Sequence, residues 1–239
     1  STKSVAFNTK QTLTFIPHFR NKDHSLMAMG RFELTSGSSN GQGTTVIGAP
    51  AGVTSPDEGS RMESMSSSFS QWRSMYYTFS THYAFKGRYM FDFSLRADGS
   101  TKFGPGRRWG YFPAVSLRWN IVDEKFMEPT RKWLSMLAVR PSWGRVGGQP
   151  NREYLFASIY SSDTRYIDMG AIKPENIRIA DLRWETNATY DLGFDLGLFD
   201  DRLTLQAEWY YATRRDMLME NVAIPSSSGY YNLSYQNVG

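Results

Sequence analysis

Cysteine is absent from this chain of 239 residues, and histidine occurs only three times. Without cysteine there is no disulfide framework, no cysteine-based zinc site, no iron–sulfur cluster and no thiol nucleophile. The histidines, His18, His24 and His82, do not have the spacing of a metal-ligating pair, and neither a G-x-S-x-G motif nor a phosphate-binding glycine motif occurs. We therefore predict no cofactor, no metal and no enzymatic activity.

Long apolar runs are also lacking, because charged residues interrupt every apolar stretch before it reaches about 18 residues. A membrane-spanning helix is therefore not predicted. The first ten residues have no apolar region typical of a secretion signal, so we expect that a leader was removed or that the chain is part of a longer protein. The net charge is only +4 and the basic residues are scattered, which argues against a nucleic-acid partner.

Aromatic residues, in contrast, make up 15% of the chain, which favours an ordered protein over a disordered one. The clearest pattern is an alternation with a period of two between residues 182 and 198. One parity holds Leu182, Trp184, Ala188, Tyr190, Leu192, Phe194, Leu196 and Leu198, with only Thr186 among them polar. The other parity is polar or charged, so the segment predicts a β-strand with one apolar and one charged face.

The same alternation recurs along the chain and predicts about eight strands. Clear runs cover residues 75–85, 89–95, 109–121 and 203–211, and weaker runs cover 12–20, 26–34 and 137–143. Several runs are much longer than the usual five or six residues, which favours a barrel wall over a sandwich. In a membrane barrel the apolar parity faces lipid and the polar parity faces the lumen.

The predicted connections support a membrane orientation. Residues 21–24, 86–87 and 199–202 form short turns, whereas 36–68 and 145–181 are expected to be long loops, with Ser66–Ser68 in a flexible one. Short and long connections roughly alternate, as they do in transmembrane barrels. Four aromatic residues near the short turns, Phe85, Tyr89, Trp119 and Phe199, are then expected to form an aromatic girdle at one membrane interface.

Three segments resemble a known family: DGSTKFGPGRRWGYFPAVSLRWNI (98–121), WLSMLAVRPSWGRVGGQ (133–149) and DLRWETNATYDLGFDLGLFDDRLTLQAEWYYATRRDML (181–218). They are similar to the C-terminal barrel of SusC/RagA-like TonB-linked outer-membrane proteins of Bacteroidetes. The resemblance implies an all-β, antiparallel, up-and-down transmembrane barrel, of which this chain supplies about eight of roughly 22 strands. It also implies import of glycans or peptides across the bacterial outer membrane, with a SusD-like surface lipoprotein and TonB as partners.

Residues 1–239 are accordingly interpreted as part of the barrel, and no plug-like stretch or TonB box precedes the matching segments. Pro141 occupies a position where the family more often has a small residue. A proline removes one donor from the hydrogen-bond ladder, so a bulge or a sheet edge is expected there.

Two sets of residues are candidates for function. The lumen-facing candidates are Arg88, Asp92, Arg96, Arg118, Arg183, Glu185, Asp191, Asp195 and Glu208. They either form ladders of opposite charge between neighbouring strands or contact a plug or a passing substrate. The loop candidates are Tyr154, Phe156, Tyr160, Tyr166, Tyr230 and Tyr231, which either bind substrate or the lid lipoprotein or pack within their own loops.

Two other interpretations remain open at this point. The chain could be a self-contained eight-stranded outer-membrane barrel that acts as an anchor or adhesin, because a barrel of eight strands can close. It could also be a soluble carbohydrate-binding β-sandwich, given its aromatics and polar loops.

Overall fold

The computed structural model describes residues 1–48, 61–166, 169–174, 176–230 and 232–239, and these residues are almost entirely β-structure. Eight long strands form one antiparallel sheet in which the spatial order is the sequence order. They are β1 (Thr2–Phe15), β2 (His24–Ile47), β3 (Arg61–Phe85), β4 (Tyr89–Ser100), β5 (Trp109–Asn120), β6 (Leu134–Gly148), β9 (Glu185–Leu198) and β10 (Leu203–Arg215). The prediction of an up-and-down sheet of about eight long strands is therefore confirmed.

Two small hairpins and three short 3-10 segments complete the described chain. The hairpins are β7 (Tyr160–Tyr166) with β8 (Met169–Pro174), and β11 (Met217–Ala223) with β12 (Asn232–Val238). The 3-10 segments are η2 (Ile121–Asp123), η3 (Lys125–Lys132) and η4 (Ser226–Ser228). Among the described residues, no helix has the length and apolar character needed to cross a membrane.

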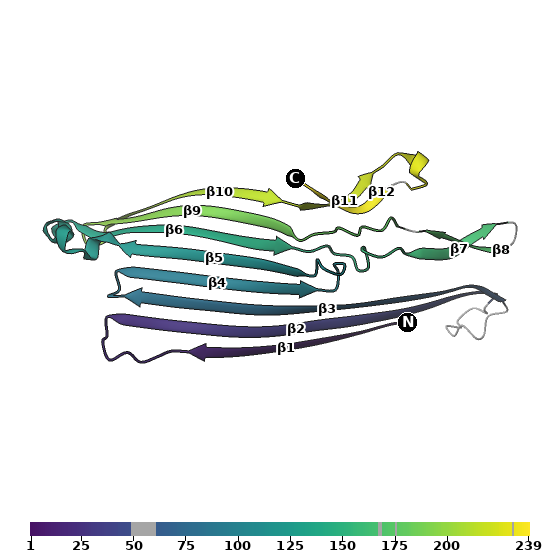
Figure 1. Ribbon diagram of the computed structural model, residues 1–239, viewed down its shortest axis with the longest axis horizontal. Helices are drawn as coiled ribbons and strands as arrows, with labels where there is room; N and C mark the ends of the chain where they lie inside the picture. The colour runs from purple at the N-terminus through teal and green to yellow at the C-terminus, as the bar shows by residue number, and fades with distance from the viewer. Residues whose placement is uncertain (49–60, 167–168, 175, 231) are drawn as a thin grey trace.

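The sheet is a single open layer (Figure 1). The short turns and η2–η3 lie at one end, and the longer connections and both small hairpins lie at the other. In the described part of the chain, β1 and β10 are edge strands that do not pair with each other. Within these described residues, the eight strands therefore do not close a barrel by themselves, and no second sheet covers either face. The self-contained barrel and the β-sandwich are both wrong.

The short turns follow from their backbone conformations. In the β3–β4 turn, Lys86 and Gly87 have φ of 55° and 65°, and the Arg88 amide donates to the Phe85 carbonyl at 3.0 Å. Two successive residues in the left-handed region produce a turn whose twist matches that of the flanking strands. In the β9–β10 turn, Asp200 and Asp201 have φ of 56° and 62°, and aspartate tolerates this region better than most residues.

Strands β2 and β3 correct the predicted loop at 36–68. They are 24 and 25 residues long and remain paired out to Ile47 opposite Arg61, beyond the ends of their neighbours (Figure 1). Ser66, Ser67 and Ser68 lie inside β3, opposite Gly43, Gln42 and Gly41, and not in a flexible loop. Their serine-rich and glycine-rich composition is typical of loops, but the continuous ladder between the two strands determines the conformation here.

Pro141 corrects a second prediction, because it lies neither at an edge nor at a bulge. It pairs with Leu192 within β6, an interior strand, and the register shift in this ladder occurs at Leu134–Met136 instead. Proline has no amide hydrogen to donate, and on the β5 side of β6 the pairing is interrupted between Val139 and Ser142.

A cluster of buried apolar residues lies at the long-loop end of the sheet. It consists of Phe103, Phe112, Leu155, Leu182, Trp184 and Tyr235, all less than 9% exposed. These residues come from the β4–β5 loop, β5, the β6–β9 connection and β12. We call them the loop cluster.

Leu182 and Trp184 in this cluster contradict the prediction that they face lipid. Strand β9 begins only at Glu185, so the alternation of its side chains does not extend to the residues before it. The Trp184 ring instead packs on Phe103, with centroids 4.6 Å apart, and its Nε1 donates to the Arg108 carbonyl at 3.4 Å.

Two glycines make room for the cluster. A Cβ atom at Gly110 would lie 2.6 Å from the Phe112 ring, and one at Gly147 would approach the same ring even more closely. Phe112 is 6% exposed and also packs edge-on against Trp184, so its ring has little room to move away.

We predict that Gly147→Ala in the intact protein lowers the free energy of unfolding by about 1–3 kcal/mol, because the added methyl group overpacks the loop cluster. The measurement is the denaturant midpoint of the folded band in heat-modifiable gel migration. Gly30→Ala is the matched control, because a Cβ there has no heavy atom within 4 Å. Equal midpoints for both variants would contradict the prediction.

Candidate functional site

The main sheet has one continuous apolar face. Directly paired residues lie on the same face, so one row can be followed across all eight strands. This row is Phe15, Ala28, Thr81, Phe93, Val115, Trp143, Tyr190 and Tyr211. Large apolar side chains on this face are widely exposed, among them Leu13 at 77% and Leu205 at 59%. Such an extensive exposed apolar surface requires an apolar environment around it.

Aromatic rings form a row at each margin of this face. Towards the short turns, Phe85, Tyr89 and Trp119 stack in sequence, with centroids 6.3 and 6.4 Å apart. Towards the long loops, Tyr77 lies 5.1 Å from Phe32 and 5.9 Å from Trp109. On the strands farther along the sheet, Trp143, Tyr190 and Tyr211 form a separate run of rings on the same face, with centroids 6.4 and 6.5 Å apart.

The two aromatic rows delimit a band of the height expected for a membrane wall. Tyr77 and Phe85 lie in the same strand, and the interval between them corresponds to roughly 26 Å along the strand at about 3.3 Å per residue. A strand tilt of about 40° reduces this to roughly 20 Å, close to the apolar band of about 25 Å in outer-membrane barrels. Sequence reasoning predicted only the row near the short turns. Phe199 lies at that same end in the β9–β10 turn and is exposed.

The opposite face is polar and contains a charge cluster that joins three neighbouring strands. Arg140 of β6 donates from Nε and Nη2 to the two carboxylate oxygens of Asp195 in β9, each at 2.9 Å. Arg118 of β5 places Nη1 3.4 Å from Asp195 Oδ2. Asp195 is 3% exposed, so these two arginines supply the polar contacts that water does not reach it to make.

A second polar cluster lies on β3, β4 and β5. The His82 Nδ1 atom is 2.6 Å from Asp92 Oδ1, and the Ser116 hydroxyl donates to Asp92 Oδ2 at 3.4 Å. The serine contacts the carboxylate and not the imidazole, so this is no nucleophile–base pair. These side-chain contacts add to the backbone pairing of β3 with β4 and of β4 with β5.

The remaining lumen candidates are distributed along the same face, with one exception. Arg96 pairs with Asp98 at 2.6 Å, and Glu185 lies 3.5 Å from Arg214. Arg118, Arg140, Asp191 and Glu208 line a hollow of about 510 Å³ on this face. Arg183 is the exception, because it precedes β9 and pairs with Asp181 at 2.5 Å in the loop region.

Glu124 connects the η2–η3 segment to the aromatic row near the short turns, a contact that sequence reasoning did not predict. It lies between η2 and η3 and accepts hydrogen bonds from the Tyr89 hydroxyl and from Trp119 Nε1, the latter at 3.2 Å. Arg88, a lumen candidate, approaches it to 3.5 Å. The hydrogen bond from Tyr89 is the main reason why the pKa of Glu124 lies below its ordinary value.

Polar contacts connect the separate long loops around the loop cluster. Asp181, before β9, lies 2.8 Å from Arg107 of the β4–β5 loop, and the hydrogen bond from Arg183 lowers its pKa. Lys102 of the same loop donates to the Pro150 carbonyl at 2.9 Å and pairs with Glu153 at 3.6 Å. Burial nevertheless raises the pKa of Glu153.

The predicted loop aromatics are not equivalent. The Tyr154 hydroxyl is fixed by the backbone of Gln71, which donates to it at 2.9 Å and accepts from it at 3.1 Å, and Phe156 packs beside Gly104. Tyr160, at the start of β7, is 63% exposed. Tyr166 pairs with Met169 in the β7–β8 hairpin, Tyr230 is half-buried, and Tyr231 lies outside the described residues.

We predict that Asp195→Asn lowers the free energy of unfolding of the intact protein by about 1–3 kcal/mol, because two arginines then lose their shared counter-charge. Denaturant midpoints of the folded protein provide the measurement. Asp191→Asn is the control, because the Asp191 side chain lies on the same face but makes no hydrogen bond or ion pair in the described part of the chain. An effect of Asp191→Asn as large as that of Asp195→Asn would contradict the assignment.

Comparisons with known proteins agree with this geometry. The model of a family described as TonB dependent receptor-like, beta-barrel matches residues 2–239. TonB-dependent receptor P39 of Formosa agariphila is 34% identical over 157 residues, and TonB-dependent receptor SusC of Bacteroides thetaiotaomicron is 30% identical over 167 residues. Each match covers 66% of this chain but only 15% and 16% of the respective relative, so the chain spans a small part of their length.

Solved structures show the same fold. The structure of the RagAB peptide transporter superposes with a TM-score of 0.83 at 23% identity, over 100% of this chain and 26% of that chain. The siderophore receptor PirA from Pseudomonas aeruginosa superposes with a TM-score of 0.59 at 13% identity, over 99% and 37%. The chain therefore belongs to the TonB-dependent receptor-like β-barrel family, and its sheet is part of an outer-membrane barrel wall.

Proposed function

We propose that residues 1–239 form part of the barrel wall of a SusC/RagA-type importer that takes up glycans or peptides through the outer membrane. The observation that carries this proposal is the continuous separation of an apolar and a polar face across eight strands in register. Lipid offers no hydrogen-bond partners to a backbone, so a wall whose amides and carbonyls pair between strands is what a membrane pore requires.

In this proposal the polar face lines the lumen, and the ion pairs that join its strands stiffen the wall. β1 and β10 are the edge strands of the described sheet. In this proposal they pair with further strands of a longer protein, which also supplies the plug. The family is one of receptors and transporters rather than enzymes. The similarity to a protein named SusC supports the assignment of the import type, and the RagAB structure, which is that of a peptide transporter, keeps peptides among the substrates.

The proposed partners are a SusD-like surface lipoprotein, TonB and outer-membrane lipid. The lipoprotein docks at the long-loop end, where the loop cluster and its ion pairs hold three connections together and the exposed Tyr160 projects from β7. TonB contacts parts of the protein outside these residues.

Uptake by cells tests the transport proposal. Cells carrying the intact gene, a deletion, or the intact gene with TonB removed are given fluorescent oligosaccharides or fluorescent oligopeptides. We expect uptake of one of the two substrate classes, lost equally in the deletion and in the TonB-deficient strain. Unchanged uptake of both classes in the deletion strain would contradict the proposal, as would uptake that does not depend on TonB.

Charge insertion tests which face is in lipid. We predict that Phe194→Arg lowers the stability of the folded barrel by about 2–4 kcal/mol, because the arginine enters the hydrocarbon region. The measurement is the denaturant midpoint of the protein folded in lipid vesicles. Phe194 is 44% exposed on the apolar face.

Thr189→Arg is the matched variant on the polar face of the same strand, where the side chain lines a hollow with Asp191 and Glu208. We expect a much smaller cost there, because the new charge remains in water, in a hollow that two carboxylates and the guanidinium groups of Arg118 and Arg140 line. An equal loss of stability in Phe194→Arg and Thr189→Arg would contradict the assignment of the apolar face to lipid.

A further inference from the structure

The apolar face has a trough in β2, where side chains are small between two strands with large ones. Gly30 pairs with Leu13 of β1 on one side and with Phe79 of β3 on the other. A Cβ atom at Gly30 would have no heavy atom within 4 Å, so the backbone forms an open floor. Ala28, the preceding residue on this face, extends the low floor towards the short turns.

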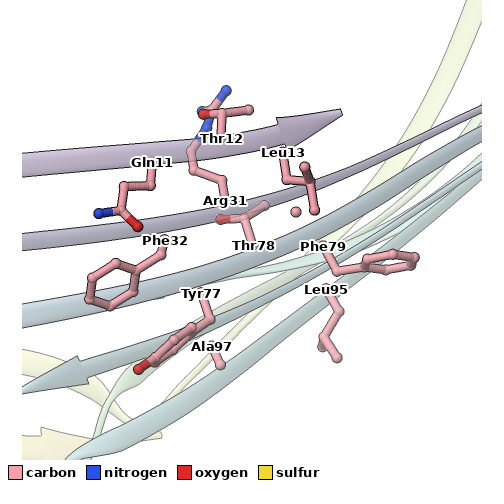
Figure 2. A pocket seen from close by; sticks show the side chains of 11 residues that line it. Gln11, Thr12, Leu13, Arg31, Phe32, Tyr77, Thr78, Phe79, Leu95 and Ala97 are labelled. Atoms are coloured by element: carbon pink, nitrogen blue, oxygen red, sulfur yellow. The ribbon is translucent and has the colours of Figure 1, made fainter. Parts of the chain in front are cut away.

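Large apolar side chains define the walls and one end of this trough, which we call the Gly30 groove. It has a volume of about 600 Å³. Figure 2 shows Leu13, Phe79 and Leu95 on one side of the view, and Phe32, Tyr77 and the Gln11 amide on the other. The Phe32 and Tyr77 rings belong to the aromatic row near the long loops, with centroids 5.1 Å apart.

The width of the groove suits a single hydrocarbon chain. Leu13 and Phe79 lie on strands two positions apart, and adjacent strands are about 4.8 Å apart, so the walls are roughly 10 Å apart at the backbone. A chain centred over Gly30 is then close to the contact distance of about 4 Å from side-chain carbons on both sides.

We propose that the Gly30 groove binds one acyl chain of an outer-membrane lipid in the leaflet on the long-loop side. The groove lies inside the apolar band and is continuous with the membrane-facing surface, so its surroundings are lipid. The Gln11 amide lies in the same register row as Phe32 and Tyr77, at the level where the ester or amide carbonyl of a lipid meets the interface. The inference rests on the membrane-facing assignment of this face and goes beyond the proposed transport function.

Photo-crosslinking tests the proposal with the intact protein reconstituted in vesicles of phosphatidylethanolamine that carries a diazirine on one acyl chain. For the native sequence, we expect crosslinks to concentrate on peptides containing Leu13, Ala28–Phe32 and Phe79. We expect Gly30→Leu to reduce these crosslinks roughly tenfold, because its side chain displaces at least two contacting methylene groups. Gly30→Ala, which adds one methyl group, should reduce them about fourfold.

Ala207→Leu is the matched control, because Ala207 is a small, exposed residue of β10 on the same face, opposite Phe194 and remote from β2. It should leave the crosslinks at the groove unchanged. Crosslinks spread evenly over the apolar face, or equally strong at the groove in Gly30→Ala and the native protein, would overturn the proposal. Failure of the membrane assignment itself is distinguishable, because Phe194→Arg would then be tolerated.

Discussion

The hydrogen-bonded register between neighbouring strands is the constraint on which the rest of the structure depends. Side chains alternate between faces with a period of two, so a slip of one residue in any ladder would exchange the faces of the strands beyond it. The row from Phe15 to Tyr211 stays in register across seven ladders. The same ladders satisfy the backbone where lipid cannot, so one set of bonds both permits the wall to exist in a membrane and separates its faces.

The polar face and the loop cluster show how the register is reinforced. Asp195 with its two arginines joins β5, β6 and β9, and Asp92 with His82 and Ser116 joins β3, β4 and β5. Asp92, Arg118, Asp195 and Glu185 make contacts between neighbouring strands, whereas Arg96 pairs within its own strand and Arg88 and Arg183 pair with residues outside the sheet. At the long-loop end, Phe112 on the wall packs against residues from three other segments, so these connections are tied to the barrel and to one another.

The alternation of Leu192, Phe194 and Leu196 with Asp191, Gly193 and Asp195 was enough to predict a strand and its two faces, because this pattern is local. Prediction from local pattern failed where the composition or parity of a segment did not indicate how it pairs with other strands. The run at Ser66–Ser68 has a loop-like composition but lies in a strand, since β2 offers a partner along its whole length. Trp184 has the parity of the apolar face, yet it turns into the loop cluster because β9 starts one residue later.

By itself, the sequence determined the class of fold, the two-faced character of the strands and the positions of the β3–β4 and β9–β10 turns, because each depends on neighbouring residues and on a period of two. The turn predicted at 21–24 was misplaced, because β1 ends at Phe15 and the connection to β2 spans 16–23. Only the tertiary structure decided which side chains meet across strands: the shared arginines of Asp195, the aromatic row of Phe32, Tyr77 and Trp109, and the groove over Gly30. These contacts join residues far apart in the chain, and their alignment is set by the pairing register, which no local pattern encodes.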